Sequence, residues 1–171
     1  MTPEIQLAQF ISRFNPLDVP PDGLARARQV LMAVVGTTMA GIDEDGCEAL
    51  ALHLITEGGA QQATVLGWGH KLPASKAALI NGVMARALDF CDAIPPGLHA
   101  GSSVVPAALA AAELRGGCNS LDFLGAIALG VEVATRMNLS EAMYDGFDPT
   151  GVAGVFGSAA AAAWLLGLDT Y

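Results

Sequence analysis

Apolar residues recur at intervals of three and four along most of the chain, a spacing that is typical of helices buried on one face. The first such run follows Pro3 and is broken by Asn15 and Pro16. Similar runs continue to the end of the chain and predict further helices. We expect helices at about residues 2–14, 22–39, 48–56, 74–88, 104–115, 121–137 and 151–168, with a short helical piece near residues 140–144.

Strand signals are confined to one short stretch. Residues 61–68 (QQATVLGW) are rich in β-formers, and Gly69, His70 and Lys71 after them are expected to form a turn. Ser120 is expected to cap the helix that follows it. Since no fixed repeat or low-complexity linker divides the chain, the pattern predicts one all-α domain over residues 1–171.

The last predicted helix is the most apolar, because residues 150–168 include no charged side chain over nineteen positions. Length alone would allow a membrane span. Its Ala- and Gly-rich composition and the lack of flanking Lys or Arg favour a helix buried at the centre of the domain. Gly151, Gly154 and Gly157 recur there every three residues, which indicates either close packing against another helix or a wall along which a substrate approaches the backbone.

Composition and charge narrow the possible partners. Hydrophobic residues make up 53% of the chain and charged residues 15%, so we expect a folded protein whose apolar surface meets another subunit, as in a homodimer. The formal net charge of −9 argues against nucleic acid and against an anionic membrane surface. A small anionic substrate would need local cations, for which the candidates are Lys71, Lys76, Arg86, Arg115 and Arg136.

The sequence also bears on location and cofactors. Three cysteines without a CxxC pair, and an N-terminus without a signal-peptide pattern, favour a cytoplasmic protein. His53 and His70 are too scattered for metal-ligand spacing, so no metal site is expected. Neither GxGxxG after a strand nor GxxxxGK[ST] occurs, so no nucleotide cofactor is expected. Any chemistry is therefore predicted to be free of cofactors.

Polar groups gather in residues 81–106 (NGVMARALDFCDAIPPGLHAGSSVVP), between two apolar helices. This stretch and its surroundings resemble the MmgE/PrpD family. The similarity is carried by NGVMARALDFCD, LHAGSSVVPAALAAAE, LGAIALGVEVATRM and GFDPTGVAGVFGSAAAAAWLLGLD, with VVGTTMAG and ATVLGWGHKLPASKAALING in support. These segments cover nearly the whole chain in order.

The resemblance implies a large all-helical domain, a dimer, and proton transfer next to carboxylates without a metal. Elimination, decarboxylation or epimerisation are the outcomes of that chemistry in the family. The family also has a smaller α/β lid domain and later lysines that hold substrate carboxylates. Neither is found in these 171 residues, so the chain resembles the N-terminal part of the helical domain only.

Three residues match the family's site pattern. Asp89 and Asp92 fall on aspartates of LDFDDTH, and His99 falls on the histidine of the next HP step. His99 would act as general acid or base, since imidazoles titrate near neutral pH, and Asp89 would orient its ring. The alternative is that Asp89 ends its helix and His99 is a loop residue. Asp92 is a weaker catalytic candidate, for which a structural hydrogen bond is the alternative.

Four positions depart from the pattern, since Ala93 stands where the family often has threonine and Ala100 where it has proline, and the other two bear on chemistry. Cys91 stands where the family usually has aspartate, and the histidine of its GFHxT motif falls on Asp148. Cys91 would be a nucleophile only with a stabilised thiolate, and with no evident cation nearby we expect a small buried filler. Asp148 is a candidate proton carrier in place of the lost histidine, or a turn residue before Pro149.

Substrate binding is assigned to residues close to Asp89 and His99 in the sequence. Ser102 and Ser103, with Gly101, are expected at a helix N-terminus, where backbone N–H groups bind a carboxylate or the serines act as simple N-caps. Arg86, one turn before Asp89, is the candidate cation.

Three functional hypotheses follow. The leading one is a cofactor-free lyase or isomerase that moves a proton next to a carboxyl or carbonyl group of a small molecule. The second is a non-catalytic or half-enzyme subunit completed by a partner chain that supplies the lid and lysines. The third is a pocket adapted to a more apolar biosynthetic intermediate, which the missing lysines favour.

Overall fold

The helical spacing of the sequence corresponds to seven α-helices in the computed structural model, which describes residues 1–143 and 145–170. They are α1 (Pro3–Ser12), α2 (Pro21–Ala40), α3 (Cys47–Glu57), α4 (Ala74–Arg86), α5 (Ala100–Leu114), α6 (Ser120–Met137) and α7 (Pro149–Leu166). The 3₁₀ helices η1 (Pro16–Asp18) and η2 (Glu141–Met143) are also present. The predicted all-α class is confirmed, and Tyr144, in the piece expected near residues 140–144, lies outside the described residues.

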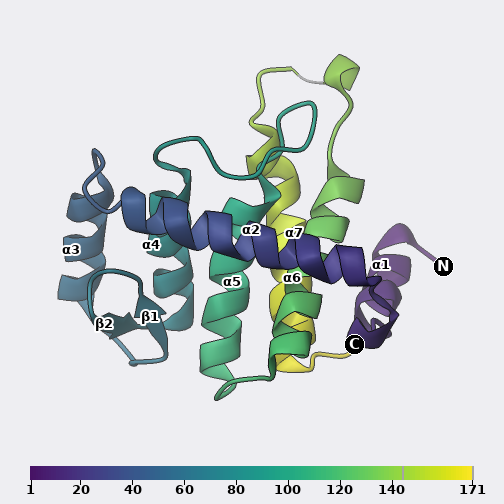
Figure 1. The fold of residues 1–171 in the computed structure, drawn as a ribbon, viewed down its shortest axis with the longest axis horizontal. Coiled ribbons are helices and arrows are strands. Elements are labelled where there is room, and N and C mark those ends of the chain that lie inside the picture. The colour runs from purple at the N-terminus through teal and green to yellow at the C-terminus, as the bar shows by residue number, and fades with distance from the viewer. Residues whose placement is uncertain (144, 171) are drawn as a thin grey trace.

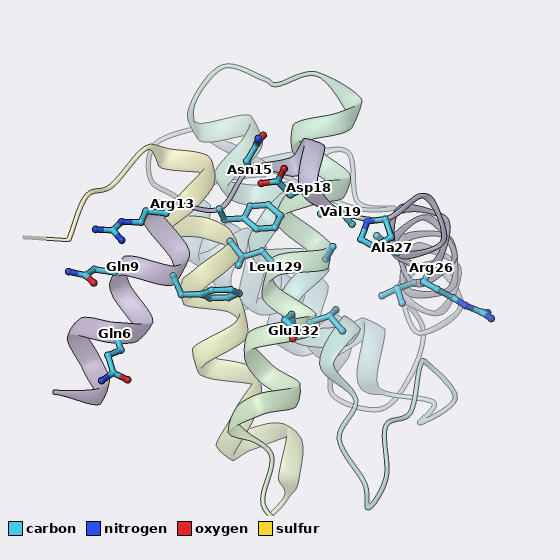
Figure 2. A pocket seen from close by; sticks show the side chains of 17 residues that line it. Gln6, Gln9, Arg13, Asn15, Asp18, Val19, Arg26, Ala27, Leu129 and Glu132 are labelled. Carbon is cyan, nitrogen blue, oxygen red and sulfur yellow. The ribbon is translucent and has the colours of Figure 1, made fainter. Parts of the chain in front are cut away.

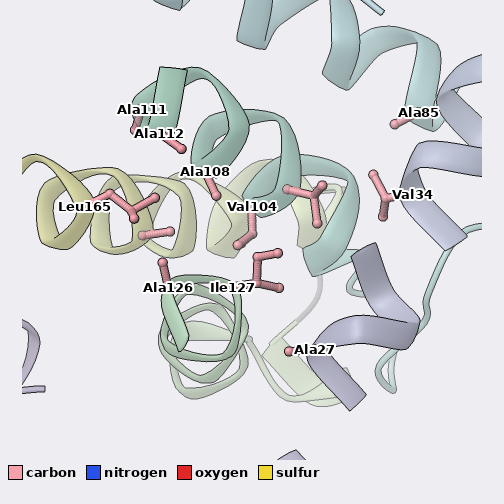
Figure 3. Packing of buried hydrophobic residues seen from close by; sticks show 12 residues of the cluster. Ala27, Val34, Ala85, Val104, Ala108, Ala111, Ala112, Ala126, Ile127 and Leu165 are labelled. Carbon is pink, nitrogen blue, oxygen red and sulfur yellow. The ribbon is translucent and has the colours of Figure 1, made fainter. Parts of the chain in front are cut away.

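The centre of the domain consists of α5, α6 and α7, which pack side by side, while α2 crosses over the bundle (Figure 1). Val104 and Ala108 of α5 meet Ile127 of α6 and Leu165 of α7 in a buried cluster (Figure 3). Helix α4 continues the layer beyond α5, and α3 and the strands lie past it. Because alanines fill much of this core, the helices approach one another closely.

Two of the three regularly spaced glycines in α7 permit such an approach. A Cβ atom on Gly157 would overlap with the carbonyl oxygen of Gly130 in α6, and one on Gly154 would lie 2.7 Å from Oγ of Ser103 in α5. Gly151 is different, since it is exposed and its nearest neighbour would be 3.9 Å away. The packing interpretation is therefore confirmed for Gly154 and Gly157, whereas Gly151 has no neighbour that requires glycine.

Helix α7 is also long and apolar enough to cross a membrane by length and composition, with 39% of its residues buried inside the structure. It packs against both α5 and α6, as predicted for a central helix. Its opposite face, which carries Val155 and Phe156, is exposed.

The strand prediction was partly wrong. Strand β1 (Ala63–Val65) pairs antiparallel with β2 (His70–Leu72), so His70 and Lys71 belong to a strand and the turn precedes them. The buried Asn81 of α4 ties this hairpin to the bundle: its Oδ1 accepts from the N–H of Leu66 at 3.0 Å, and its Nδ2 donates to the carbonyl of Thr64 at 2.9 Å. The amide thus adds two hydrogen bonds to the apolar cluster in which Ala63, Val65 and Leu72 bury one face of this short sheet.

Two helix starts also differ from the predictions. Helix α6 has Asn119 as its N-cap, not Ser120, because Oδ1 of Asn119 accepts from the N–H of Asp122 at 2.8 Å. Helix α5 begins at Ala100, four residues before the predicted start. Its first turn is stabilised from outside the helix by Asp92, a contact between residues nine positions apart.

Candidate functional site

Helix α4 ends at Arg86 with Ala87 as its C-cap, and Asp89 lies in the turn that follows. Its backbone N–H donates to the carbonyl of Arg86 at 3.1 Å, and its φ of 55° is in the left-handed region, where aspartate is among the tolerated non-glycine residues. This turn leaves the Asp89 side chain 68% exposed and in contact with the guanidinium of Arg86. The ion pair with Arg86 holds the Asp89 carboxylate at the start of the loop between α4 and α5.

The second predicted residue, His99, lies at the other end of the same loop, immediately before α5. Its Nε2 atom is 3.6 Å from Oδ1 of Asp89, and its side chain is only 16% exposed. Its backbone N–H donates to Oγ1 of Thr150, the second residue of α7, at 2.9 Å. The structure therefore brings Asp89 and His99 together, as expected, and α7 fixes the backbone that presents the ring.

Cys91 occupies the other edge of the ring, where sequence reasoning expected a filler. Its Sγ atom lies 3.6 Å from Nδ1 of His99. Burial, and next the charge of Asp92, raise the pKa of the Cys91 thiol, while Ser102 and Arg86 oppose this shift. The thiol is only half-buried and touches the predicted acid–base group, so it belongs to the site.

The carboxylate of Asp92 contacts the first turn of α5. Both of its carboxylate oxygens lie within hydrogen-bonding distance of the N–H of Gly101, at 3.1 and 3.0 Å. Burial raises the pKa of Asp92, although the Gly101 N–H, His99 and Arg86 act in the opposite direction. A Cβ atom on Gly101 would overlap with this carboxylate. The contact matches the structural interpretation of Asp92.

The two serines have different surroundings. The buried Ser102 donates its hydroxyl to the carbonyl of His99 at 2.8 Å, so it closes the first turn of α5. Ser103 faces the glycine at position 154 of α7. Since Asp92 already accepts from Gly101, one of the backbone donors expected to bind a substrate carboxylate is taken.

Asp148, the candidate replacement for a lost histidine, is the N-cap of α7. Its Oδ1 accepts from the N–H of Thr150 at 2.8 Å, and the residue is exposed. Asp148 therefore matches the second interpretation, a turn residue before Pro149. It lies two positions before Thr150, which accepts the hydrogen bond from the His99 N–H. Figure 1 shows why these positions meet: the loop after α4 and the segment before α7 lie at the same end of the bundle.

Thr150 was not among the predicted site residues. Its hydroxyl is buried at the start of α7 and accepts the hydrogen bond from a residue fifty-one positions earlier. A threonine directly after an Asp-Pro pair is typical of a helix start, so the local sequence pattern does not predict a contact between Thr150 and His99. The family motif GFHxT, whose threonine falls on Thr150, was the one feature that pointed to it.

Comparison with known proteins adds to this geometry. Residues 5–171 match the model of the MmgE/PrpD N-terminal domain. The chain belongs to the MmgE/PrpD family. This confirms the resemblance inferred from the motifs around Asp89, His99 and residues 146–169.

Curated relatives share the same domain. The chain is 30% identical to the cis-aconitate decarboxylase-like protein oryM of Aspergillus oryzae, over 96% of this chain and 36% of that protein. It is 36% identical to human cis-aconitate decarboxylase and 38% to the mouse protein, over 60% of this chain and 24% and 23% of theirs. The chain thus spans about a third or less of the length of these relatives.

The five cations that the sequence offered for an anionic substrate all have partners: four pair with a carboxylate, and Arg115 donates to a backbone carbonyl. The Nε atom of Arg86 is the exception within its own side chain: it is buried and has no hydrogen-bond partner among the residues that the structure describes. The pairs are Lys71–Glu113 at 2.9 Å, Lys76–Glu57 at 2.8 Å, Arg136–Glu132 at 2.6 Å, Arg86–Asp89, and Arg115 with the carbonyl of Leu165 at 2.6 Å.

A groove of about 830 Å³ lies elsewhere in the domain, between α1, η1, α2 and α6 (Figure 2). Phe10, Phe14 and Leu129 line it, and Arg13 and Arg26 stand at its edges. None of the predicted catalytic residues lines this groove. Within residues 1–143 and 145–170, no group of three or more His, Cys, Asp or Glu side chains is arranged to hold a metal ion.

Proposed function

We propose that this domain carries the acid–base group of a lyase or isomerase that moves a proton next to a carboxyl or carbonyl group. The observation that supports it most directly is the placement of His99, whose ring lies between Asp89 and Cys91. Its MmgE/PrpD membership, and relatives that are cis-aconitate decarboxylases, favour a reaction of the dehydratase or decarboxylase type.

Each residue has a role in this proposal. His99 transfers the proton, because an imidazole exchanges protons readily near neutral pH. Asp89 orients the ring through Nε2 and stabilises positive charge on it. Arg86 lies against Asp89, and its guanidinium is the candidate partner for a substrate carboxylate at this site. The proposed proton transfer uses these side chains alone and involves no cofactor.

The pairing of the cations limits the charge that this domain alone offers to a substrate. A dicarboxylate or tricarboxylate needs several cations to offset its desolvation, and here Lys71, Lys76 and Arg136 each face a carboxylate. We therefore propose that the remaining positive charge comes from further residues of the assembly, as in a homodimer or a complex with a second chain. Exposed apolar side chains at the site end, Phe90, Met143 and Phe147, are consistent with a covered surface.

The test compares turnover of cis-aconitate by the wild-type chain with that of His99→Ala. Loss of a general acid or base lowers turnover by about a hundredfold or more. His53→Ala is the matched control, because His53 lies exposed on α3 and pairs with Glu57. Wild-type turnover in His99→Ala contradicts the proposal.

A half-enzyme subunit is the second candidate, favoured by the same paired cations. Size-exclusion chromatography of the chain, alone and with a candidate partner, separates the two. A homodimer with turnover of its own contradicts the half-enzyme, whereas turnover that appears only in a mixed complex supports it.

A further inference from the structure

The two ring nitrogens of His99 have chemically different neighbours. Nε2 lies 3.6 Å from Oδ1 of Asp89, and Nδ1 lies 3.6 Å from Sγ of Cys91. The three side chains form a row from the exposed carboxylate, across the largely buried ring, to the half-buried thiol. Each neighbour restricts where the hydrogen of a neutral ring can reside.

An ionised carboxylate has no hydrogen to donate and acts solely as an acceptor. When Nε2 pairs with Asp89, it must therefore carry the hydrogen. A neutral imidazole has one N–H, so Nδ1 is then a bare acceptor. The neighbour that fits a bare Nδ1 is a donor, and the Cys91 thiol supplies the S–H group.

We propose that Cys91 is a positioning residue that fixes His99 in the Nε2–H tautomer by donating its thiol hydrogen to Nδ1. In this state His99 presents a proton, rather than a lone pair, on the nitrogen beside the exposed Asp89. The catalytic meaning of this tautomer rests on the proposed function, whereas the tautomer itself is a property of the free protein.

The surroundings of the thiol favour its donor form. Burial first, and then the Asp92 carboxylate, raise the pKa of Cys91, so the hydrogen stays on sulfur at neutral pH. Arg86 opposes this effect and would support the thiolate once it forms. Asp89, Asp92 and Arg86 are the charged groups that bear on the pair.

The arrangement also balances a proton delivery. If Nε2–H gives its proton to a carbanionic carbon of the substrate, a C–H bond forms and the N–H bond breaks. In the same step Nδ1 takes the thiol hydrogen, so that S–H breaks and Nδ1–H forms without an imidazolate intermediate. The ring stays neutral throughout, and the negative charge moves from the substrate carbon to the sulfur of Cys91. The reverse sequence returns each hydrogen to its starting atom.

The test is nitrogen NMR of the full chain labelled with ¹⁵N-histidine, without substrate, at a pH where the rings are neutral. His53 and His70, which are exposed, provide internal references, and His99→Asn assigns the remaining signals. We expect a protonated Nε2 and an unprotonated Nδ1 for His99. An Nδ1–H ring in the wild-type protein overturns the proposal without any variant.

Two substitutions and a control sharpen the result. In Cys91→Asp both ring nitrogens face a carboxylate acceptor, so Nδ1 is expected to become protonated in addition to Nε2; a ring whose Nδ1 stays unprotonated contradicts the role of Cys91. Cys91→Ala is expected to yield a mixture of both tautomers, and a pure Nε2–H ring there contradicts it too. Cys118→Ala, at a half-buried cysteine on another part of the domain, should leave the His99 signals unchanged.

Kinetics then separate this inference from the proposed function. Cys91→Ala should lower kcat by about twofold or more, since the fraction of rings with the hydrogen on Nδ1 lacks the acid form that the reaction uses. If His99→Ala retains turnover, the proposed function fails while the tautomer result stands. If His99→Ala is inactive and Cys91→Ala keeps both a pure Nε2–H ring and the wild-type kcat, the inference about Cys91 fails alone.

Discussion

The carboxylate of Asp92 caps α5 from outside the helix, with both oxygens within hydrogen-bonding distance of the Gly101 N–H, at 3.1 and 3.0 Å. Helix starts leave their first N–H groups without partners inside the helix, and here a side chain from the preceding loop supplies one. The same contact anchors the loop that connects Asp89 to His99.

We therefore predict that Asp92→Ala destabilises the domain by about 1–2 kcal/mol, as the loss of a helix cap does elsewhere. Asp92→Asn keeps one acceptor oxygen and should recover at least about half of this loss. Urea unfolding followed by circular dichroism measures both. Equal stability of the Ala variant and wild type would remove the capping role and return Asp92 to the list of catalytic candidates.

Sequence pattern was sufficient for most of the helices because their apolar spacing and Gly or Pro boundaries are local features. It missed the start of α5, since the cap comes from Asp92 rather than from the helix itself. It likewise placed the turn at His70, because a strand of three residues has too few positions to show alternation. Family motifs, not periodicity, were needed to single out Asp89 and His99.

The part of the site that sequence could not supply lies in contacts between distant segments. The hydrogen bond from His99 to Thr150 joins the loop before α5 to the first turn of α7, and the apolar periodicity around either residue does not predict it. Cys91 was expected to be a filler, yet its position relative to Nδ1 of His99 depends on how the loop folds between α4 and α5.

A second prediction concerns the anchor of His99 on α7. Thr150→Val removes the oxygen that accepts the His99 N–H at 2.9 Å while keeping the side-chain volume. Leaving that donor unpaired should cost about 1–3 kcal/mol, and Thr150→Ser should restore most of it. Thermal unfolding of the two variants measures the difference. A valine variant as stable as the serine variant would show that water or another group replaces the hydroxyl.

A third prediction uses two glycines of α7 as a matched pair. A methyl group at position 157 meets the backbone oxygen of Gly130, which has little freedom to move, so Gly157→Ala should cost about 1–3 kcal/mol. Gly151→Ala places the same group in open space and should stabilise the helix by up to about 1 kcal/mol. Denaturant midpoints of the two variants should move in opposite directions. A shift in the same direction for both would contradict the close contact between α6 and α7.

A fourth prediction concerns pH. Burial alone would raise the pKa of Glu113, but hydrogen bonds from Lys71 and Thr64 outweigh it and hold the pKa below its usual value. A carboxylate with a lowered folded-state pKa stabilises the protein above its unfolded-state pKa, and this contribution disappears as the pH falls through the folded value. We therefore expect the wild-type melting temperature to fall more steeply below about pH 4.5 than that of Glu113→Gln.

The matched control for that experiment is Glu132→Gln. Glu132 also pairs with a cation, Arg136, but on the exposed surface of α6, and its loss should leave the acid limb of the profile unchanged. If the wild-type protein and Glu113→Gln lose stability in parallel between neutral and acid pH, the contacts of Glu113 with Lys71 and Thr64 do not stabilise the fold through its ionised carboxylate.

The imidazole of His99 is held by two separate parts of the chain. Thr150 on α7 fixes where the residue's backbone lies, whereas the side chains at positions 89 and 91 contact the ring itself. The residue that fixes the position of the His99 backbone is therefore different from the residues that contact its ring nitrogens. Under the proposed tautomer, a substitution at position 91 would change which ring nitrogen carries the hydrogen and would leave the Thr150 contact to the His99 backbone in place.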